Sequence, residues 1–97
     1  MKLFGNKKAA PELVTTGRFE LEQDGQVAYL EYALAGPVLE LRHTEVPEAL
    51  RRKGFASALA KTALDWAREN HKKVDVICPL VAGYLKEHPE YADLILR

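Results

Sequence analysis

Three consecutive cations and a glycine, Arg51, Arg52, Lys53 and Gly54, stand directly before an alanine-rich stretch with helical spacing. The first turn of a helix exposes unpaired N–H groups, and the helix macrodipole adds about half a positive charge there. Such an end binds anions, phosphates above all. Glycine has no Cβ, so a ligand can approach its backbone closely. The stretch predicts a diphosphate cradle, although a solvated basic loop would carry the same residues.

Two polar residues near the end of a predicted strand could move protons. His43 alternates with Leu39 and Leu41, so we expect these three side chains to share one face. It is then either a satisfied core histidine or a general base, because an ordinary histidine pKa of about 6.5 suits proton transfer at neutral pH. Glu45 is either a base that acts through water or an edge carboxylate.

Two further residues could take part in acyl chemistry. Cys78 ends a short apolar strand just before a proline, where a cysteine is usually a small buried hydrophobe. As a nucleophile it could instead accept an acyl group, thioester to thioester, if His43 favours its thiolate. Tyr84 follows on the next helix, either as a proton donor or as a packing residue.

The elements that must position these residues follow from the change of hydrophobic period along the chain. Alternation predicts strands over residues 17–23, 26–34 and 38–46, joined by Asp-Gly and Gly-Pro turns into an antiparallel meander. Helical spacing then runs from residue 55 to about 70, a short strand covers 74–78, and two short helices cover 80–87 and 90–96. A strand–helix–strand step favours parallel pairing of the third and fourth strands. We expect an α/β (α+β) domain with a mixed sheet over residues 13–97, after a flexible N-terminal arm over 1–12.

Composition excludes several classes of protein. The 97 residues fit one domain, and the formal net charge of zero argues against general nucleic-acid or acidic-membrane binding. A single cysteine allows no internal disulfide, and neither a signal peptide nor a run of about 18 apolar residues is present. We therefore expect a cytoplasmic protein, a monomer or weak homodimer, with no nucleic-acid or membrane partner. The histidines and the cysteine have no local metal-ligand spacing, so no metal is expected.

The segment Arg51-Arg52-Lys53-Gly54-Phe55-Ala56 resembles the Gln/Arg-x-x-Gly-x-Gly/Ala motif of the GNAT acyltransferases. The stretches "HTEVPEALRRKGFASALAKTALDWA" and "CPLVAGYLKEHPEY" are similar to a small stand-alone branch of that superfamily, and the likeness spans Phe19 to Tyr91. The resemblance implies that this loop binds the diphosphate of acetyl-CoA, mainly through backbone N–H groups. It also implies that the third strand splays from the fourth, with the pantetheine arm in the resulting V.

Carried over residue by residue, the resemblance assigns a site. It places CoA against Glu45, Val46, Pro47, Arg51, Arg52, Lys53, Gly54, Phe55 and Ala56, and it directs His43 and Cys78 toward the acetyl group. Tyr84 would protonate the departing thiolate, although its sequence surroundings differ from the family pattern. The implied function is an acetyl-CoA-dependent N-acetyltransferase that acts on a small amine or a protein lysine. A non-catalytic CoA-binding or acyl-CoA-sensing module is the alternative, and a nucleic-acid or partner-binding module is a third.

Overall fold

The computed structural model describes residues 14–96, which form one four-stranded mixed sheet in the order β1-β2-β3-β4. The strands are β1 (Thr15–Gln23), β2 (Gln26–Ala35), β3 (Val38–Glu45) and β4 (Lys73–Val76). The helices are η1 (Glu48–Leu50), α1 (Phe55–Glu69), α2 (Pro79–Lys86) and η2 (Pro89–Leu94), of which η1 and η2 are 3₁₀. The expected order of elements and the mixed α/β class are confirmed. The predicted arm, residues 1–12, lies outside the described residues.

The first three strands form the predicted antiparallel meander because their turns have the required backbone geometry. Asp24 and Gly25 join β1 to β2 with φ of 54° and 77°, both in the left-handed region that a tight two-residue hairpin needs. Gly36 occupies the same region, with φ of 57°, in the turn between β2 and β3. These turns set the register that places Phe19 and Leu30 opposite one another in the core.

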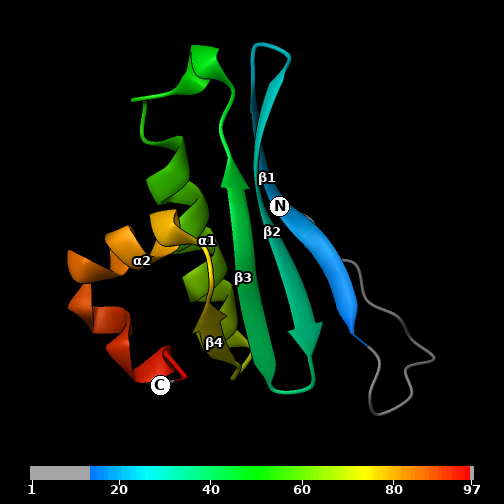
Figure 1. The fold of residues 1–97 in the computed structure, drawn as a ribbon, viewed down its shortest axis with the longest axis vertical. Helices are drawn as coiled ribbons and strands as arrows, with labels where there is room; N and C mark the ends of the chain where they lie inside the picture. The colour runs from blue at the N-terminus through cyan, green and yellow to red at the C-terminus, as the bar shows by residue number, and fades with distance from the viewer. Residues whose placement is uncertain (1–13, 97) are drawn as a thin grey trace.

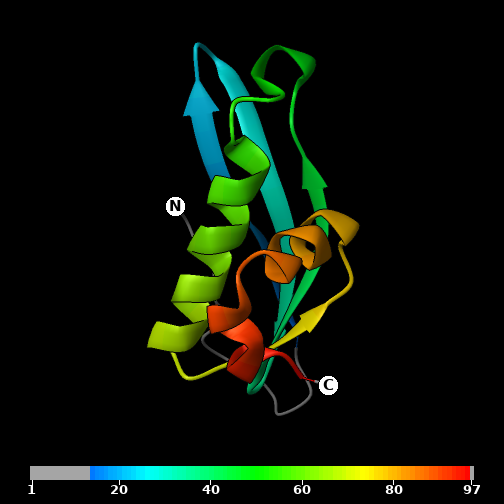
Figure 2. The ribbon, with the colours of Figure 1, turned by 90° about the vertical axis from the view of Figure 1, so that its left-hand side faces the viewer.

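The described helices all lie on one face of the sheet (Figures 1 and 2). The inner stripe of α1 consists largely of small residues, which lets its backbone approach the strands closely. Its buried members are Leu59, Ala60, Ala63, Leu64 and Ala67, as the helical period predicts. Within residues 14–96 no helix is both long enough and apolar enough to cross a membrane.

The last 3₁₀ helix, η2, is held on α1 by hydrogen bonds. Tyr91 Oη donates to Asp65 Oδ1 at 2.6 Å, and Arg68 pairs with Asp93 through both terminal nitrogens at 3.0 Å. The hydrogen bond to the Asp65 carboxylate, together with burial, raises the pKa of Tyr91 to about 12. The predicted helix over 90–96 is therefore a shorter 3₁₀ helix that is fixed by side-chain contacts.

Strand β4 pairs parallel to β3, as predicted, but only over four residues. The pairing runs from Val38 opposite Lys73 to Leu41 opposite Val76. The N–H groups of Ile77 and Cys78 then both donate to the Leu41 carbonyl at 3.0 Å, and the chain turns into α2. Because two successive N–H groups share one carbonyl of β3, the ladder of hydrogen bonds does not advance further along β3. The predicted strand over 74–78 therefore ends two residues early.

Strand β3 carries a bulge that reverses its inward and outward faces. Opposite it, Glu31 pairs with His43 and the next residue of β2, Tyr32, pairs with Leu41. Arg42 is therefore an extra residue on β3, and an extra residue shifts the two-residue alternation by one. Leu39 and Leu41 remain buried, but beyond the bulge Thr44 is buried and His43 is exposed. The expectation that His43 shares the face of Leu39 and Leu41 is wrong for this reason.

Candidate functional site

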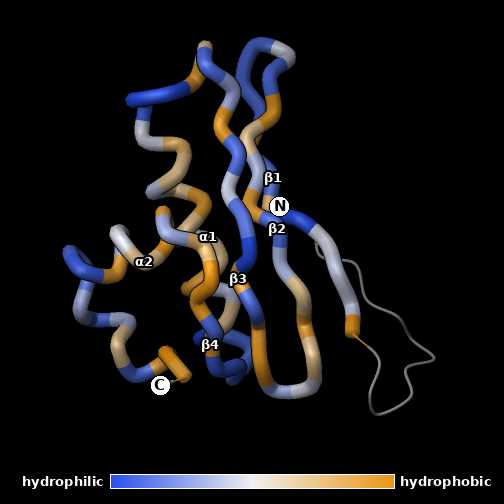
Figure 3. Tube along the Cα trace, viewed as in Figure 1, coloured by the Kyte–Doolittle hydropathy of each residue, from blue (hydrophilic) through white to orange (hydrophobic). Residues whose placement is uncertain are grey.

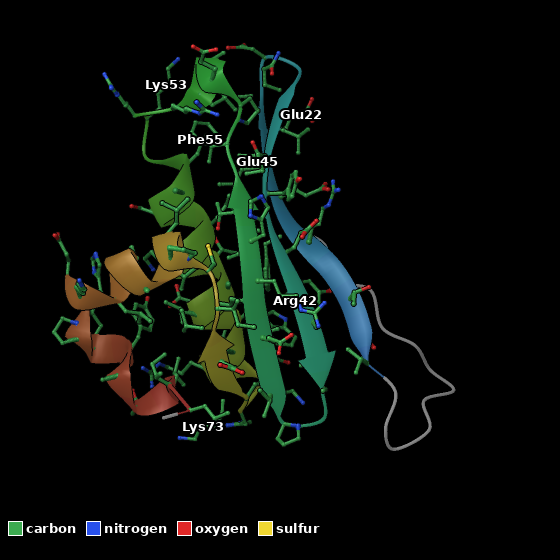
Figure 4. All side chains as sticks on the ribbon, viewed as in Figure 1. Glu22, Arg42, Glu45, Lys53, Phe55 and Lys73 are labelled. Atoms are coloured by element: carbon green, nitrogen blue, oxygen red, sulfur yellow. The ribbon has the colours of Figure 1, made fainter. Side chains whose placement is uncertain are left out.

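A cleft of about 500 Å³ lies between the end of β3 and the start of α1. Seven of the nine residues that the sequence assigned to CoA line it: Glu45, Val46, Arg51, Arg52, Gly54, Phe55 and Ala56. Pro47 and Lys53 do not appear among its walls. Four residues that the sequence analysis missed complete the lining: Thr44, Leu50, Ser57 and Leu80. Figure 4 shows Lys53, Phe55 and Glu45 near the same end of the molecule.

The start of α1 presents open N–H groups to this cleft. Gly54 is its N-cap residue, with φ of 85°, and the N–H of Ala58 donates to the Gly54 carbonyl at 2.9 Å. No side chain of the described residues caps the helix, and its first turn contains no acidic residue. The N–H groups of Phe55, Ala56 and Ser57 precede the first intrahelical donor, so they are free to bind an anion.

The basic loop before α1 combines a brace with a charge on the cleft wall. Arg51 Nε donates to the Val46 carbonyl at 3.0 Å and ties the loop to the end of β3. Arg52 lines the cleft and adopts a left-handed backbone conformation, with φ of 64°. Figure 3 shows the loop as a strongly hydrophilic segment directly before α1. Arg51 therefore both supports the loop and lines the cleft, and Arg52 adds a second charge to the cleft wall.

The parting of β3 and β4 leaves an edge of β3 without a partner strand. On the β4 side, pairing among the described residues stops at Leu41, while β3 continues to Glu45. Backbone groups of a strand edge that no neighbouring strand covers can bond an extended ligand, as in strand addition. The cleft lies along this part of β3, since Thr44, Glu45 and Val46 line it.

His43 and Glu45 form a pair on the outer face of β3. His43 Nε2 lies 3.1 Å from Glu45 Oε1, and the two side chains are 56% and 48% exposed. The His43 ring also meets the Tyr29 ring edge to face, with centroids 6.5 Å apart. Because Glu45 also lines the cleft, the pair connects the open face of the sheet with the cleft margin.

Thr44 and Cys78 meet on the opposite, buried side of β3. Thr44 Oγ1 lies 3.2 Å from Cys78 Sγ, and the residues are 7% and 2% exposed. Thr44 lines the cleft, whereas Cys78 is not among the cleft-lining residues that the structure describes. The structure thus brings Cys78 together with Thr44, and it places His43 on the other face of the strand.

Tyr84 lies in a second, smaller hollow of about 230 Å³ rather than in the cleft. Its ring stacks on His88, with centroids 3.9 Å apart and planes 15° from parallel. Leu80, one helical turn earlier on α2, lines both hollows, as do Ala56 and Ser57. Tyr84 therefore stacks on His88 at the margin of the cleft, and its role as a proton donor stays a prediction.

Of the cleft-lining residues that the sequence did not predict, Ser57 had a signal in the sequence and Thr44 had none. Ser57 is the third residue of a helix whose first turn was expected to bind an anion, so its position alone indicated it. Thr44 became a wall of the cleft only through the bulge at Arg42, for which no local sequence signal was found. Within residues 14–96, no group of three or more His, Cys, Asp or Glu side chains is arranged to hold a metal ion.

A family model described as GCN5-related N-acetyl-transferase matches residues 18–94. The chain belongs to this family. The match covers the whole sheet beyond the first residues of β1, the cleft and both C-terminal helices, so the GNAT resemblance of the basic loop is confirmed. Family membership supports an acetyltransferase-type function for this domain.

Individual proteins are also similar in sequence to this chain. "Protein NATD1" of Mus musculus is 43% identical over 63 residues, which are 64% of this chain and 57% of the mouse protein. "Protein NATD1" of Danio rerio is 37% identical over 82 residues, which are 82% of this chain and 74% of the fish protein. The chain therefore aligns with little more than half the length of the mouse relative.

Proposed function

We propose that this domain binds acetyl-CoA in the cleft and transfers its acetyl group to an amine. The observation that supports this most directly is the joining of an uncapped helix start, a glycine with positive φ and an unpaired strand edge in one cleft. A helix start suits the diphosphate, and an open strand edge suits the amides of the pantetheine arm. The helix start and the strand edge would thus bind the diphosphate and the pantetheine arm of one CoA molecule.

The diphosphate would lie against the N–H groups of Phe55, Ala56 and Ser57. Backbone donors supply direction, and Arg52 adds a full charge at the wall. The pantetheine arm would extend along Glu45 and Val46 toward the point where β3 and β4 part. The thioester then arrives close to Thr44 at the buried side of the strand.

Transfer forms a C–N bond and breaks the C–S bond of the thioester, and the amine must lose one proton. The His43–Glu45 pair stands at the cleft margin and faces the uncovered side of the sheet. In our proposal the amine approaches along the cleft margin, where Glu45 lines the wall, and gives its proton to this pair. The departing CoA thiolate takes a proton from solvent. Tyr84 receives no role in this step, because its contacts lie in the second hollow.

Two measurements test the proposal in order. Titration calorimetry with CoA and with acetyl-CoA measures binding, and a short oligonucleotide serves as the competing ligand. Release of free thiol from acetyl-CoA is then followed over a panel of a polyamine, an aminoglycoside and lysine-containing peptides. Saturable CoA binding together with amine-dependent thiol release is the expected result. Binding of the oligonucleotide without binding of CoA would overturn the proposal.

A non-catalytic CoA-binding module remains the second candidate function. A CoA-binding role would need the cleft alone, and the proposed acceptor side is an exposed sheet face, where the His43 and Glu45 side chains are 56% and 48% exposed. CoA binding without thiol release from any amine of the panel would favour this candidate.

A further inference from the structure

Apart from the tyrosines and Cys78, Thr44 is the one buried residue with a polar side chain among those that the structure describes. It is 7% exposed, and what remains exposed belongs to the wall of the cleft. The bulge at Arg42 is the cause, because it turns Thr44 inward and His43 outward. A hydroxyl group therefore occupies the position where the sequence pattern placed an imidazole.

The contact between Thr44 and Cys78 leaves two ways in which this hydroxyl can be used. A hydroxyl offers one hydrogen and two acceptor lone pairs, and a thiol is a weak donor and a weak acceptor. Either atom can donate across the 3.2 Å contact, and our proposal takes the Cys78 S–H as the donor to Thr44 Oγ1. The hydroxyl hydrogen of Thr44 then remains available to the cleft.

We propose that Thr44 donates a hydrogen bond to the carbonyl oxygen of the bound thioester and that Cys78 is a positioning residue. This inference rests on the proposed function, since it assigns a role within the same cleft. A donor aimed at that oxygen gains strength as the oxygen becomes negative during attack by the amine. Cys78 holds the hydroxyl in its donor orientation through its own S–H group.

The burial of Cys78 argues against a covalent role for its sulfur. The residue is 2% exposed and sits behind Thr44, which forms the cleft wall. A nucleophilic sulfur would have to reach the thioester carbon from the cleft side. In this arrangement the acetyl group passes directly from CoA to the amine, and no bond forms to Cys78.

The test compares CoA with acetyl-CoA, because only acetyl-CoA carries the carbonyl oxygen. Thr44→Val keeps the shape of the side chain and removes the hydroxyl, and Thr44→Ser is the matched control that keeps it. We expect Thr44→Val to bind CoA within about twofold of the parent and to bind acetyl-CoA about five- to tenfold more weakly. Thr44→Ser should recover most of the acetyl-CoA affinity. Equal loss of both ligands, or no loss of either, would overturn the inference.

Cys78 is tested with two variants and by mass. Cys78→Ser keeps a donor and should retain the acetyl-CoA affinity of the parent chain, whereas Cys78→Ala should reduce it. Intact-mass analysis after mixing the parent chain with acetyl-CoA should show no acetyl adduct. An adduct that disappears in Cys78→Ala would establish a covalent role and refute the positioning role. If the parent chain fails to bind CoA itself, the proposed function fails first, so the two failures are distinguishable.

Discussion

Substitution of Gly54 by valine separates the geometry of the loop from the stability of the fold. Gly54 has φ of 85°, and a Cβ built on it would meet no atom within 4 Å. Packing therefore does not require glycine at this position. The backbone conformation does require glycine, because the left-handed region costs a residue with a side chain about 1–2 kcal/mol.

Gly36 provides a matched control. Its φ is 57°, a Cβ there would also meet nothing within 4 Å, and it lies in the turn between β2 and β3, away from the cleft. Both Gly54→Val and Gly36→Val should lower the free energy of unfolding by about 1–2 kcal/mol. A small domain with a stability of roughly 5–15 kcal/mol stays folded after such a loss.

The two variants should differ in ligand binding. If the valine shifts the backbone at position 54 out of the left-handed region, the N–H groups at the start of α1 turn away from the diphosphate. Each hydrogen bond lost to a charged group costs about 1.5–3 kcal/mol, which corresponds to roughly 10- to 100-fold in affinity. Calorimetric titration with CoA should therefore show at least a tenfold loss for Gly54→Val and parent-like binding for Gly36→Val.

Urea unfolding of both variants supplies the stability measurement for this comparison. If Gly54→Val binds CoA as tightly as the parent chain, the helix start is not the diphosphate site. Equal loss of binding in both variants would attribute the effect to stability, and it too would refute the reasoning.

Three further substitutions test the cleft charge, the sheet and the attachment of η2. Arg52→Gln should weaken CoA binding by about fivefold and flatten its salt dependence in calorimetry, because an exposed charge contributes about 1 kcal/mol. Gly17→Ala should lower the urea midpoint by an amount equivalent to about 1–3 kcal/mol, since its Cβ would lie 2.5 Å from Tyr32 Oη. Tyr91→Phe should cost about 1–2 kcal/mol at pH 8 through the lost bond to Asp65, and the difference from the parent should shrink above pH 10.

The sign of the last prediction follows from the raised pKa of Tyr91. The folded value is about 12 and the ordinary value is 10.0, so the folded state favours the neutral phenol. Its contribution to stability is complete below pH 10 and disappears as the pH rises through 12. A difference between Tyr91→Phe and the parent that stays constant from pH 8 to pH 12 would contradict this assignment.

Arg52→Gln and Gly17→Ala each have a matched control. The control residue either does not line the cleft or has room for an added Cβ. Lys53→Gln removes a neighbouring charge that does not line the cleft, so its effect on CoA binding should be smaller than that of Arg52→Gln. Gly83→Ala adds a Cβ that meets nothing within 4 Å, so it should not lower stability. A reversed order in either pair would refute the corresponding contact.

The sequence by itself determined the local features of this protein. The Asp24-Gly25 turn, the helical stripe of α1 and the helix start at Gly54 depend on backbone propensity and on spacing over a few residues. Such signals are readable along the chain, and each of these elements lies within one or two residues of its predicted position. The family motif in the basic loop belongs to the same class of local information.

Only the tertiary structure decided which side chains meet in the cleft. One extra residue on β3, Arg42, exchanges the faces of His43 and Thr44, and nothing in the alternating pattern announces it. A bulge is selected by pairing with the neighbouring strand and by burial of one face, which are properties of the assembled sheet. The pairing of Cys78 with Thr44, and the outward position of His43, follow from that single shift in register.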